Sequence, residues 1–363
     1  MRTELFLTGA TGFIGSGLLQ QWLDGTEARI TALVRPKRGV EPGQRVRALL
    51  SQLYPESEIG ALAERVSVAE GDLTRDRFGL PDRDYERLTT QITNIVHCAA
   101  AVRFDLSLED ARRSNCGGAQ NALDLAAACR QLRRMDYVGT AYVAGTRRGL
   151  IREEELDLGQ SHNNTYERSK FEAEHRVRAA MARLPIAIFR PTIVLGDSRT
   201  GRLSPVGAFF RVFTMYAKGL LPALPGDPAT PMDLVSLDYS AAAVFEIARN
   251  PKSTGTCFHI GAGTDNLTTL GELADLAARH FGRERFVVLP PEVFAQQVAR
   301  VESRMSEEVR KKIEEIRLYA PYLMGDWRFD DSNTRAALGG TGPRPPRVRD
   351  YFGRMAAHIE SHG

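Results

Sequence analysis

The sequence has few of the features that mark secreted, metal-binding or membrane proteins. Its 363 residues include only four cysteines, Cys98, Cys116, Cys129 and Cys257, and no Cys-x-x-Cys pair. These cysteines lie in apolar or small-residue contexts, which predicts reduced core thiols in a cytoplasmic protein and no metal site. The N-terminal stretch, MRTELFLTGATGFIG, lacks the apolar run and the cleavage site of a signal peptide.

A strong charge of one sign is also missing. The 48 basic and 45 acidic residues leave a formal net charge of +3, and there is no basic low-complexity arm. This balance suits an anionic ligand and argues against a nucleic-acid-binding protein. The most apolar later window, residues 206–225, contains Arg211 and Lys218 and ends in prolines. We therefore expect no transmembrane segment there.

What the sequence does contain is an alternation of strand-like and helical patterns. Apolar runs such as ELFLTG, RITALV and NIVHCAA are each followed by a longer helical pattern. This alternation predicts an α/β fold, a Rossmann-type doubly wound parallel sheet with helices on both faces. The pattern changes after Gly196. We expect a first domain over residues 1–198, to which 232–262 return, and a smaller, partly interleaved C-terminal substrate-binding region over most of 199–363.

The first helix is preceded by a glycine-rich turn, LTGATGFIG. Gly9 permits a tight turn, Gly12 lets the backbone approach a pyrophosphate, and Gly15 allows the helix to pack closely on the strand. The helix N-terminus then offers free amides to the phosphates. This motif, with Thr11, Phe13 and Ile14 inside it, predicts a dinucleotide site.

The end of the second strand-like run, ALVRPKR, distinguishes two cofactors. Enzymes that use NAD usually carry an acid there for the ribose 2′-hydroxyl. Here Arg35 takes that place, with Lys37 and Arg38 nearby, and a guanidinium can bind a 2′-phosphate. The sequence therefore predicts NADPH/NADP+.

Further cofactor contacts are predicted at the ends of later strands. Asp72 and Leu73 in EGDLT are expected to flank the adenine, and Ala99 and Ala100 in HCAAA let the cofactor lie close to the backbone. In RPTIVLG, backbone groups at Pro191 and Ile193 are expected to fix the nicotinamide carboxamide.

The predicted catalytic residues are Thr140, Tyr166 and Lys170. In NNTYERSK, Tyr166 lies four residues before Lys170, so on a helix both project from one face. The ammonium favours the phenolate, which makes Tyr166 a proton donor or acceptor near neutral pH. Thr140, at the end of MDYVGT, would hold the substrate oxygen. Asn115 has two open interpretations, a residue that orders the helix behind the site or an ordinary buried amide.

These motifs resemble the extended short-chain dehydrogenase/reductases, and within them the fatty acyl-CoA reductase and thioester reductase branch with its male sterility-type NAD-binding domain. The similarity extends through IVHCAAAVRFDLSLEDARRSNCGGAQNALDLA, GTAYVAG, NTYERSKFEAE, FRPTIVLG, MDLVSLDYSAAAV and WRFDDSNTRAAL. It covers residues 1–260 and 327–338. The resemblance implies NADPH and places Thr140, Tyr166 and Lys170 on the family's catalytic triad. Gly139 stands where the family often has Ser.

The resemblance further implies an NADPH-dependent reductase that converts an acyl thioester to an aldehyde, with an alcohol as a further product in some members. The acyl group would arrive on coenzyme A or on an acyl carrier protein. Residues 207–226 would either line the acyl pocket or pack between the two regions. Arg147, Arg148, Arg199 and Arg202 would either meet the phosphate of the carrier arm or form a solvated rim.

Two other functions use the same core. One is an oxidoreductase or epimerase that acts on a nucleotide sugar or a hydroxysteroid-like alcohol. The other is a regulator that senses NADPH without catalysis, which the presence of both Tyr166 and Lys170 disfavours.

Overall fold

Seven parallel strands form the central sheet in the computed structural model of the chain, which describes residues 2–37, 39–204, 208–301, 305 and 307–362. In spatial order the strands are β12 (Cys257–Ile260), β7 (Ile186–Pro191), β5 (Arg134–Val138), β4 (Asn94–His97), β1 (Glu4–Thr8), β2 (Arg29–Val34) and β3 (Val66–Glu70). The chain reverses its direction of winding between β1 and β4. The predicted doubly wound parallel sheet is therefore confirmed.

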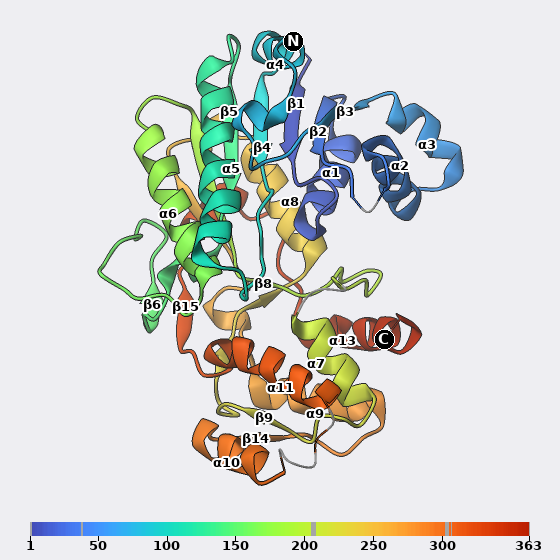
Figure 1. Cartoon of the computed structure of the whole chain (residues 1–363), viewed down its shortest axis with the longest axis vertical. Coiled ribbons are helices and arrows are strands. Elements are labelled where there is room, and N and C mark those ends of the chain that lie inside the picture. Colours follow the sequence, from blue (N-terminus) through green and yellow to red (C-terminus); the bar gives the residue numbers. More distant parts are fainter. Residues whose placement is uncertain (1, 38, 205–207, 302–304, 306, 363) are drawn as a thin grey trace.

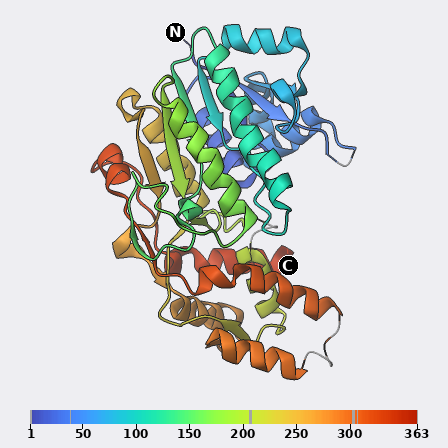
Figure 2. The same cartoon turned by 60° about the vertical axis from the view of Figure 1, so that its left-hand side comes forward.

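Helices cover both faces of this sheet (Figures 1 and 2). β5 and β7 are buried along their whole length, as expected for parallel strands enclosed on both sides. One face carries α1 (Phe13–Gly25), α2 (Pro42–Leu53), α3 (Glu56–Ala63) and α8 (Leu237–Ala248). The other carries α4 (Asp82–Gln91), α5 (Leu108–Ala128) and α6 (Thr165–Ala180).

The C-terminal region lies beyond the carboxyl ends of the strands, in the lower part of Figure 1. Its helices are α7 (Ala208–Ala217), α9 (Leu270–Phe281), α10 (Pro291–Val301), α11 (Glu307–Tyr319) and α13 (Val348–His362). A capping box between Thr269 and Glu272 begins α9, and Gly282 in a left-handed conformation ends it. The helices α7, α9, α11 and α13 share a hydrophobic core that is separate from those of the sheet.

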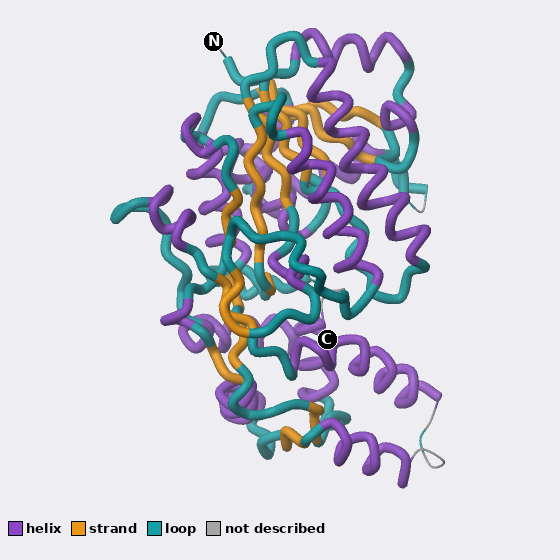
Figure 3. The backbone as a smooth tube through the Cα atoms, turned by 90° about the vertical axis from the view of Figure 1, so that its left-hand side faces the viewer, coloured by secondary structure: helices purple, strands orange, loops and turns teal. Residues whose placement is uncertain are grey.

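Short strand pairs lie outside the main sheet, and Figure 3 shows them below it. The pairs are β6 (Gly149–Ile151) with β15 (Trp327–Phe329), β8 (Ile193–Val194) with β11 (Leu234–Val235), β9 (Ala223–Pro225) with β14 (Val287–Leu289), and β10 (Pro231–Met232) with β13 (Thr268–Thr269). After β15, α12 (Ser332–Leu338) packs on β12 and α8. The chain therefore returns to the main sheet twice after leaving it.

In the part of the chain that the structure describes, no helix is both long and apolar enough to cross a membrane.

Candidate active site

The glycine loop connects β1 to α1 with little free space around its backbone. Gly9 has a φ of +79°, and a Cβ there would lie 2.8 Å from the Ala99 nitrogen. A Cβ on Gly15 would lie 1.9 Å from the Gly9 carbonyl oxygen. Gly12 is the N-cap of α1 and leaves the first amides of the helix without a side-chain partner. The loop therefore forms a cradle that only glycines fit, with helix amides available for phosphate.

One cavity of about 700 Å³ begins at this loop and continues into the C-terminal region. Most of the site residues predicted from the sequence line it: Gly9, Thr11, Gly12, Phe13, Ile14, Gly15, Arg35, Asp72, Leu73, Ala99, Ala100, Thr140, Tyr166, Lys170 and Ile193. Asn115 and Pro191 do not line it; next to Pro191, Thr192 takes that place. The structure thus brings together residues that are spread over almost two hundred positions of the chain.

Two arginines stand at the adenine end of the cavity. Arg45, on the first turns of α2, donates one hydrogen bond to the Arg35 carbonyl oxygen (2.6 Å) and another to Thr11 Oγ1 (2.9 Å). Burial, and then the charge of Arg35, lower the pKa of Arg45. The sequence interpretation missed Arg45; the available signal was a basic residue in the helix directly after a basic strand end. Arg38 lies outside the described residues.

Thr140 and Tyr166 meet at the centre of the cavity. Thr140 follows β5 and caps the short helix η2 (Ala141–Ala144), where its hydroxyl accepts a hydrogen bond from the Tyr142 amide (3.3 Å). Burial raises the pKa of Tyr166 to about 12, although a hydrogen bond from Thr140 acts in the opposite direction. The phenol is therefore protonated at neutral pH, the form that can donate a proton.

Lys170 lies one helical turn beyond Tyr166 and is almost fully buried. Its ammonium donates a hydrogen bond to the Val138 carbonyl oxygen (3.0 Å) and sits 4.5 Å from the centre of the Tyr137 ring. Burial lowers its pKa to about 8. Burial is the largest influence on the pKa of Tyr166, and the expected effect of Lys170 on the phenol stays a prediction.

Asn115 connects two segments behind the site. Its amide oxygen accepts a hydrogen bond from the Ala101 nitrogen (2.8 Å), and its amide nitrogen donates to the Ala101 oxygen and to Ser169 Oγ. These bonds tie the loop after β4 to α6, which carries Tyr166. Of its two open interpretations, these contacts favour a positioning residue over a bystander amide.

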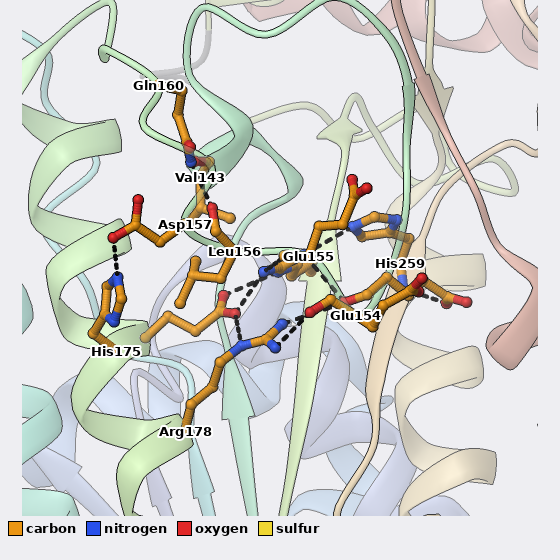
Figure 4. Close-up of polar contacts among 12 residues, drawn as sticks. Val143, Glu154, Glu155, Leu156, Asp157, Gln160, His175, Arg178 and His259 are labelled. Carbon is orange, nitrogen blue, oxygen red and sulfur yellow. Dashed lines mark hydrogen bonds and ion pairs between the residues drawn. The ribbon is translucent and has the colours of Figure 1, made fainter.

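The segment between Thr140 and Tyr166 is fixed by backbone contacts, several of which appear in Figure 4. Gln160 donates hydrogen bonds to the Val143 and Leu156 oxygens, and Arg178 donates to the Glu154 oxygen (2.8 Å). Beneath it, the buried Arg190 pairs with Glu174 (2.6 Å). The charge of Arg190 helps to lower the pKa of Glu174, although burial acts the other way. These contacts thus fix the conformation of the segment between Thr140 and Tyr166.

The far part of the cavity is apolar. Residues of α7, α9, α11 and β9, and the residue that precedes β14, line it: Phe209, Val212, Phe213, Leu224, Leu270, Leu273, Phe286 and Ile316. In the described part of residues 207–226, Phe213 lines the cavity and packs on Phe352 of α13, with 5.4 Å between ring centres. This packing lies within the C-terminal region and not between the two regions, and the role as an acyl pocket stays a prediction. Gly207 lies outside the described residues.

The four arginines considered for a carrier phosphate are placed differently. Within the described part of the chain, none of them lines the cavity. Arg147 pairs with Glu155 and Arg199 with Asp197, whereas Arg148 lies over the Trp327 ring at 4.7 Å. The positions of Arg147, Arg148 and Arg199 fit a rim better than a phosphate site. Arg202 instead lies over the Phe13 ring at 6.0 Å and donates a hydrogen bond to Ser16 Oγ (3.5 Å), beside the glycine loop.

The parallel sheet, the glycine loop and the Thr140, Tyr166 and Lys170 cluster define the chain as an extended short-chain dehydrogenase/reductase. It belongs to the male sterility protein family, an NAD-binding family whose sequence pattern matches residues 7–244. The site is thus one for a nicotinamide cofactor.

Several known proteins are similar to the chain. The solved terminal R domain of the myxalamid PKS-NRPS biosynthetic pathway has a TM-score of 0.86 and 28% identity, and covers 100% of this chain and 91% of its own. Glycine betaine reductase ATRR of Emericella nidulans is 31% identical over 75% of this chain but 22% of its own length. Fatty acyl-CoA reductase 1 of Arabidopsis thaliana is 23% identical over 91% of this chain and 88% of its own.

Two limits apply to these likenesses. The chain spans half or less of the length of the first curated relatives it matches. A UDP-glucuronic acid 4-epimerase of Bacillus cereus shares the fold with a TM-score of 0.70, but at 17% identity this likeness concerns the fold alone.

Proposed function

We propose that the chain is an NADPH-dependent reductase of acyl thioesters, carried by coenzyme A or by a carrier protein, with Tyr166 as the proton donor. The observation that carries this proposal is the single cavity that joins the dinucleotide cradle to an apolar chamber, with Thr140 and Tyr166 between them. A sugar nucleotide needs polar partners, and the chamber beyond Tyr166 is lined mainly by apolar side chains.

The preference for NADPH rests on Arg35 and Arg45. Both line the adenine end of the cavity, and Arg45 bonds Thr11 in the glycine loop. Two guanidinium groups at this position favour a 2′-phosphate over a free hydroxyl. Asp72 stands opposite them; its pKa is lowered because hydrogen bonds from Thr74 and the charge of Arg35 outweigh burial. It therefore keeps its negative charge and is a partner for the arginines and the ribose.

The bound nicotinamide would supply the hydride for the acyl carbon. The chain's residues would act on the oxygen, where negative charge develops. Thr140 and Tyr166 would donate hydrogen bonds to that oxygen, and Tyr166 would give its proton. Lys170 would hold positive charge behind the phenol and fix its position from one turn away. The apolar chamber would hold the acyl chain and exclude water.

The experiment is NADPH oxidation with dodecanoyl-CoA, the same acyl group on an acyl carrier protein, dodecanal and UDP-glucuronic acid, with products identified by mass spectrometry. We expect turnover of a thioester to dodecanal; appearance of dodecanol would extend the function to a second reduction. Turnover of UDP-glucuronic acid without any thioester turnover would refute the proposal.

A further inference from the structure

A second phenol faces the cavity close to Thr140. Tyr142 lines the cavity and is 7% exposed, and among the described residues nothing forms a hydrogen bond with its hydroxyl. Tyr322 also lines the cavity, but its hydroxyl donates to Glu167 Oε1 and accepts from Asn164 Nδ2. Unlike the enclosed hydroxyls of Tyr137 and Tyr351, the Tyr142 hydroxyl is open to the cavity, so it can hydrogen-bond to a molecule that occupies the cavity.

The Tyr142 ring is held in place on three sides. Tyr322, Trp327 and Phe329 contact it edge-to-face with ring centres 4.9, 5.4 and 5.5 Å away. Its own backbone amide donates to Thr140 Oγ1. The phenol therefore belongs to the same rigid turn as Thr140 and needs no rearrangement to meet a substrate bound there.

Reduction of a thioester creates charge at two atoms in turn. The carbonyl carbon first gains a hydride, and the oxygen takes the proton of Tyr166. When the carbonyl forms again, the oxygen returns that proton to Tyr166, the carbon–sulfur bond breaks, and its electron pair stays on sulfur as a thiolate. Tyr166 is then protonated again, so the thiolate takes its proton from water as it leaves. While the bond breaks, the sulfur has no donor among Thr140, Tyr166 and Lys170.

We propose that Tyr142 is a further catalytic residue, which donates a hydrogen bond to the thioester sulfur as the carbon–sulfur bond breaks. This inference rests on the proposed thioester reductase function. Burial, together with the charges of Asp233 and Glu167, raises the pKa of Tyr142, so the phenol remains a donor at every pH at which the protein would work. A thiol has an ordinary pKa near 8.5. A desolvated thiolate without a donor would therefore be a poor leaving group.

The test is Tyr142→Phe, which keeps the ring and its three aromatic contacts. Two dodecanoyl thioesters are compared: one with N-acetylcysteamine, whose alkyl thiolate needs stabilisation, and one with thiophenol, whose ring already spreads the charge. Tyr54→Phe is the matched control, because its hydroxyl bonds Asp24 away from the cavity. NADPH titration and thermal unfolding verify that each variant keeps its site and fold.

Wild-type turnover is measured first, and its absence with both thioesters would refute the proposed function itself. With an active wild type, we expect Tyr142→Phe to lose about ten- to a hundredfold in kcat with the N-acetylcysteamine thioester, the range of a hydrogen bond to a charged group. The loss with the thiophenyl thioester should be several times smaller. Equal losses with both thioesters, or no loss with either, would overturn the assignment to sulfur. Tyr54→Phe should match the wild type.

Discussion

Raising the pH should lower the catalytic activity, because the Lys170 ammonium loses its proton. Burial lowers the pKa of this group from its ordinary 10.5 to about 8. That difference corresponds to an unfavourable contribution of about 3 kcal/mol to the free energy of folding at neutral pH, because the charged ammonium is buried. We therefore expect kcat/KM, which reports the free enzyme, to fall as pH rises through about 8.

The effect on stability should have the opposite sign. Between pH 8 and 10.5 the unfolded chain holds this proton more often than the folded chain does. The contribution of Lys170 to the free energy of unfolding should therefore increase with pH in that window. Between pH 8 and 10.5, kcat/KM should thus fall while the contribution of Lys170 to the free energy of unfolding rises. A loss of activity from titration of the site can therefore be distinguished from alkaline unfolding.

The assay is the pH profile of kcat/KM and of kcat, with Lys170→Arg as the matched variant. Arginine stays charged over this range, so the fall near pH 8 should disappear even if the larger guanidinium lowers the rate. Cofactor oxygens that accept hydrogen bonds from the ammonium would favour its charged form, so the fall in kcat should lie at higher pH. A fall near pH 8 that persists in Lys170→Arg would refute the reasoning.

Five further variants test other parts of the structure. Tyr166→Phe should lower kcat about a hundredfold or more while NADPH affinity, followed by fluorescence titration, stays unchanged; parental turnover would remove the chemical basis of the reductase assignment. Arg35→Ala and Arg45→Ala should each weaken NADPH binding by about 1.5–3 kcal/mol and leave NADH binding little changed, and equal losses for both cofactors would contradict a 2′-phosphate site. Gly15→Ala should lower the free energy of unfolding in urea by about 1–3 kcal/mol or more, because its Cβ would meet the Gly9 oxygen. Gly43→Ala, in open space on α2, should raise it by up to about 1 kcal/mol, and a similar effect of both substitutions would show that the cradle is loose.

Local sequence patterns were sufficient for the sheet and for the glycine loop. The alternation of apolar runs and helical patterns carries the information for a parallel sheet because each strand is enclosed on both faces. Similarly, the spacing of Gly9, Gly12 and Gly15 reflects contacts within one loop and the strand beside it. For example, the helical pattern expected after RITALV is α2.

The protonation state of Tyr166 could not be predicted from the sequence in the same way. The spacing to Lys170 is correct for one helix face, but the pKa of the phenol depends chiefly on burial, which is set by the whole cavity. Likewise, the sequence does not reveal that Arg45 of α2 lies beside the glycine loop, because its contact with Thr11 depends on how α2 packs in three dimensions. The catalytic roles of Thr140, Tyr166, Lys170 and Asn115 stay predictions, and the variants above test those of Tyr166 and Lys170.

The beginning of the catalytic helix shows why a motif alone does not make this site. Asn164 caps α6 through the Glu167 amide, and the buried Glu167 carboxylate reaches back to Asn163. Tyr322, from the C-terminal region, completes this arrangement by hydrogen bonding both Asn164 and Glu167. Without that phenol, the buried Glu167 and the half-buried Asn164 next to Tyr166 would each lose a partner.

Tyr322 also connects the N-terminal cap of α6 to the cavity. Phe104 contacts both Tyr322 and Tyr166, with ring centres 5.5 and 5.7 Å apart. The C-terminal region that lines the apolar part of the cavity therefore also helps to fix the position of Tyr166. We therefore expect the main sheet and its glycine loop to be sufficient for dinucleotide binding. The position of Tyr166, by contrast, should depend on the contacts that the C-terminal region makes with the start of α6.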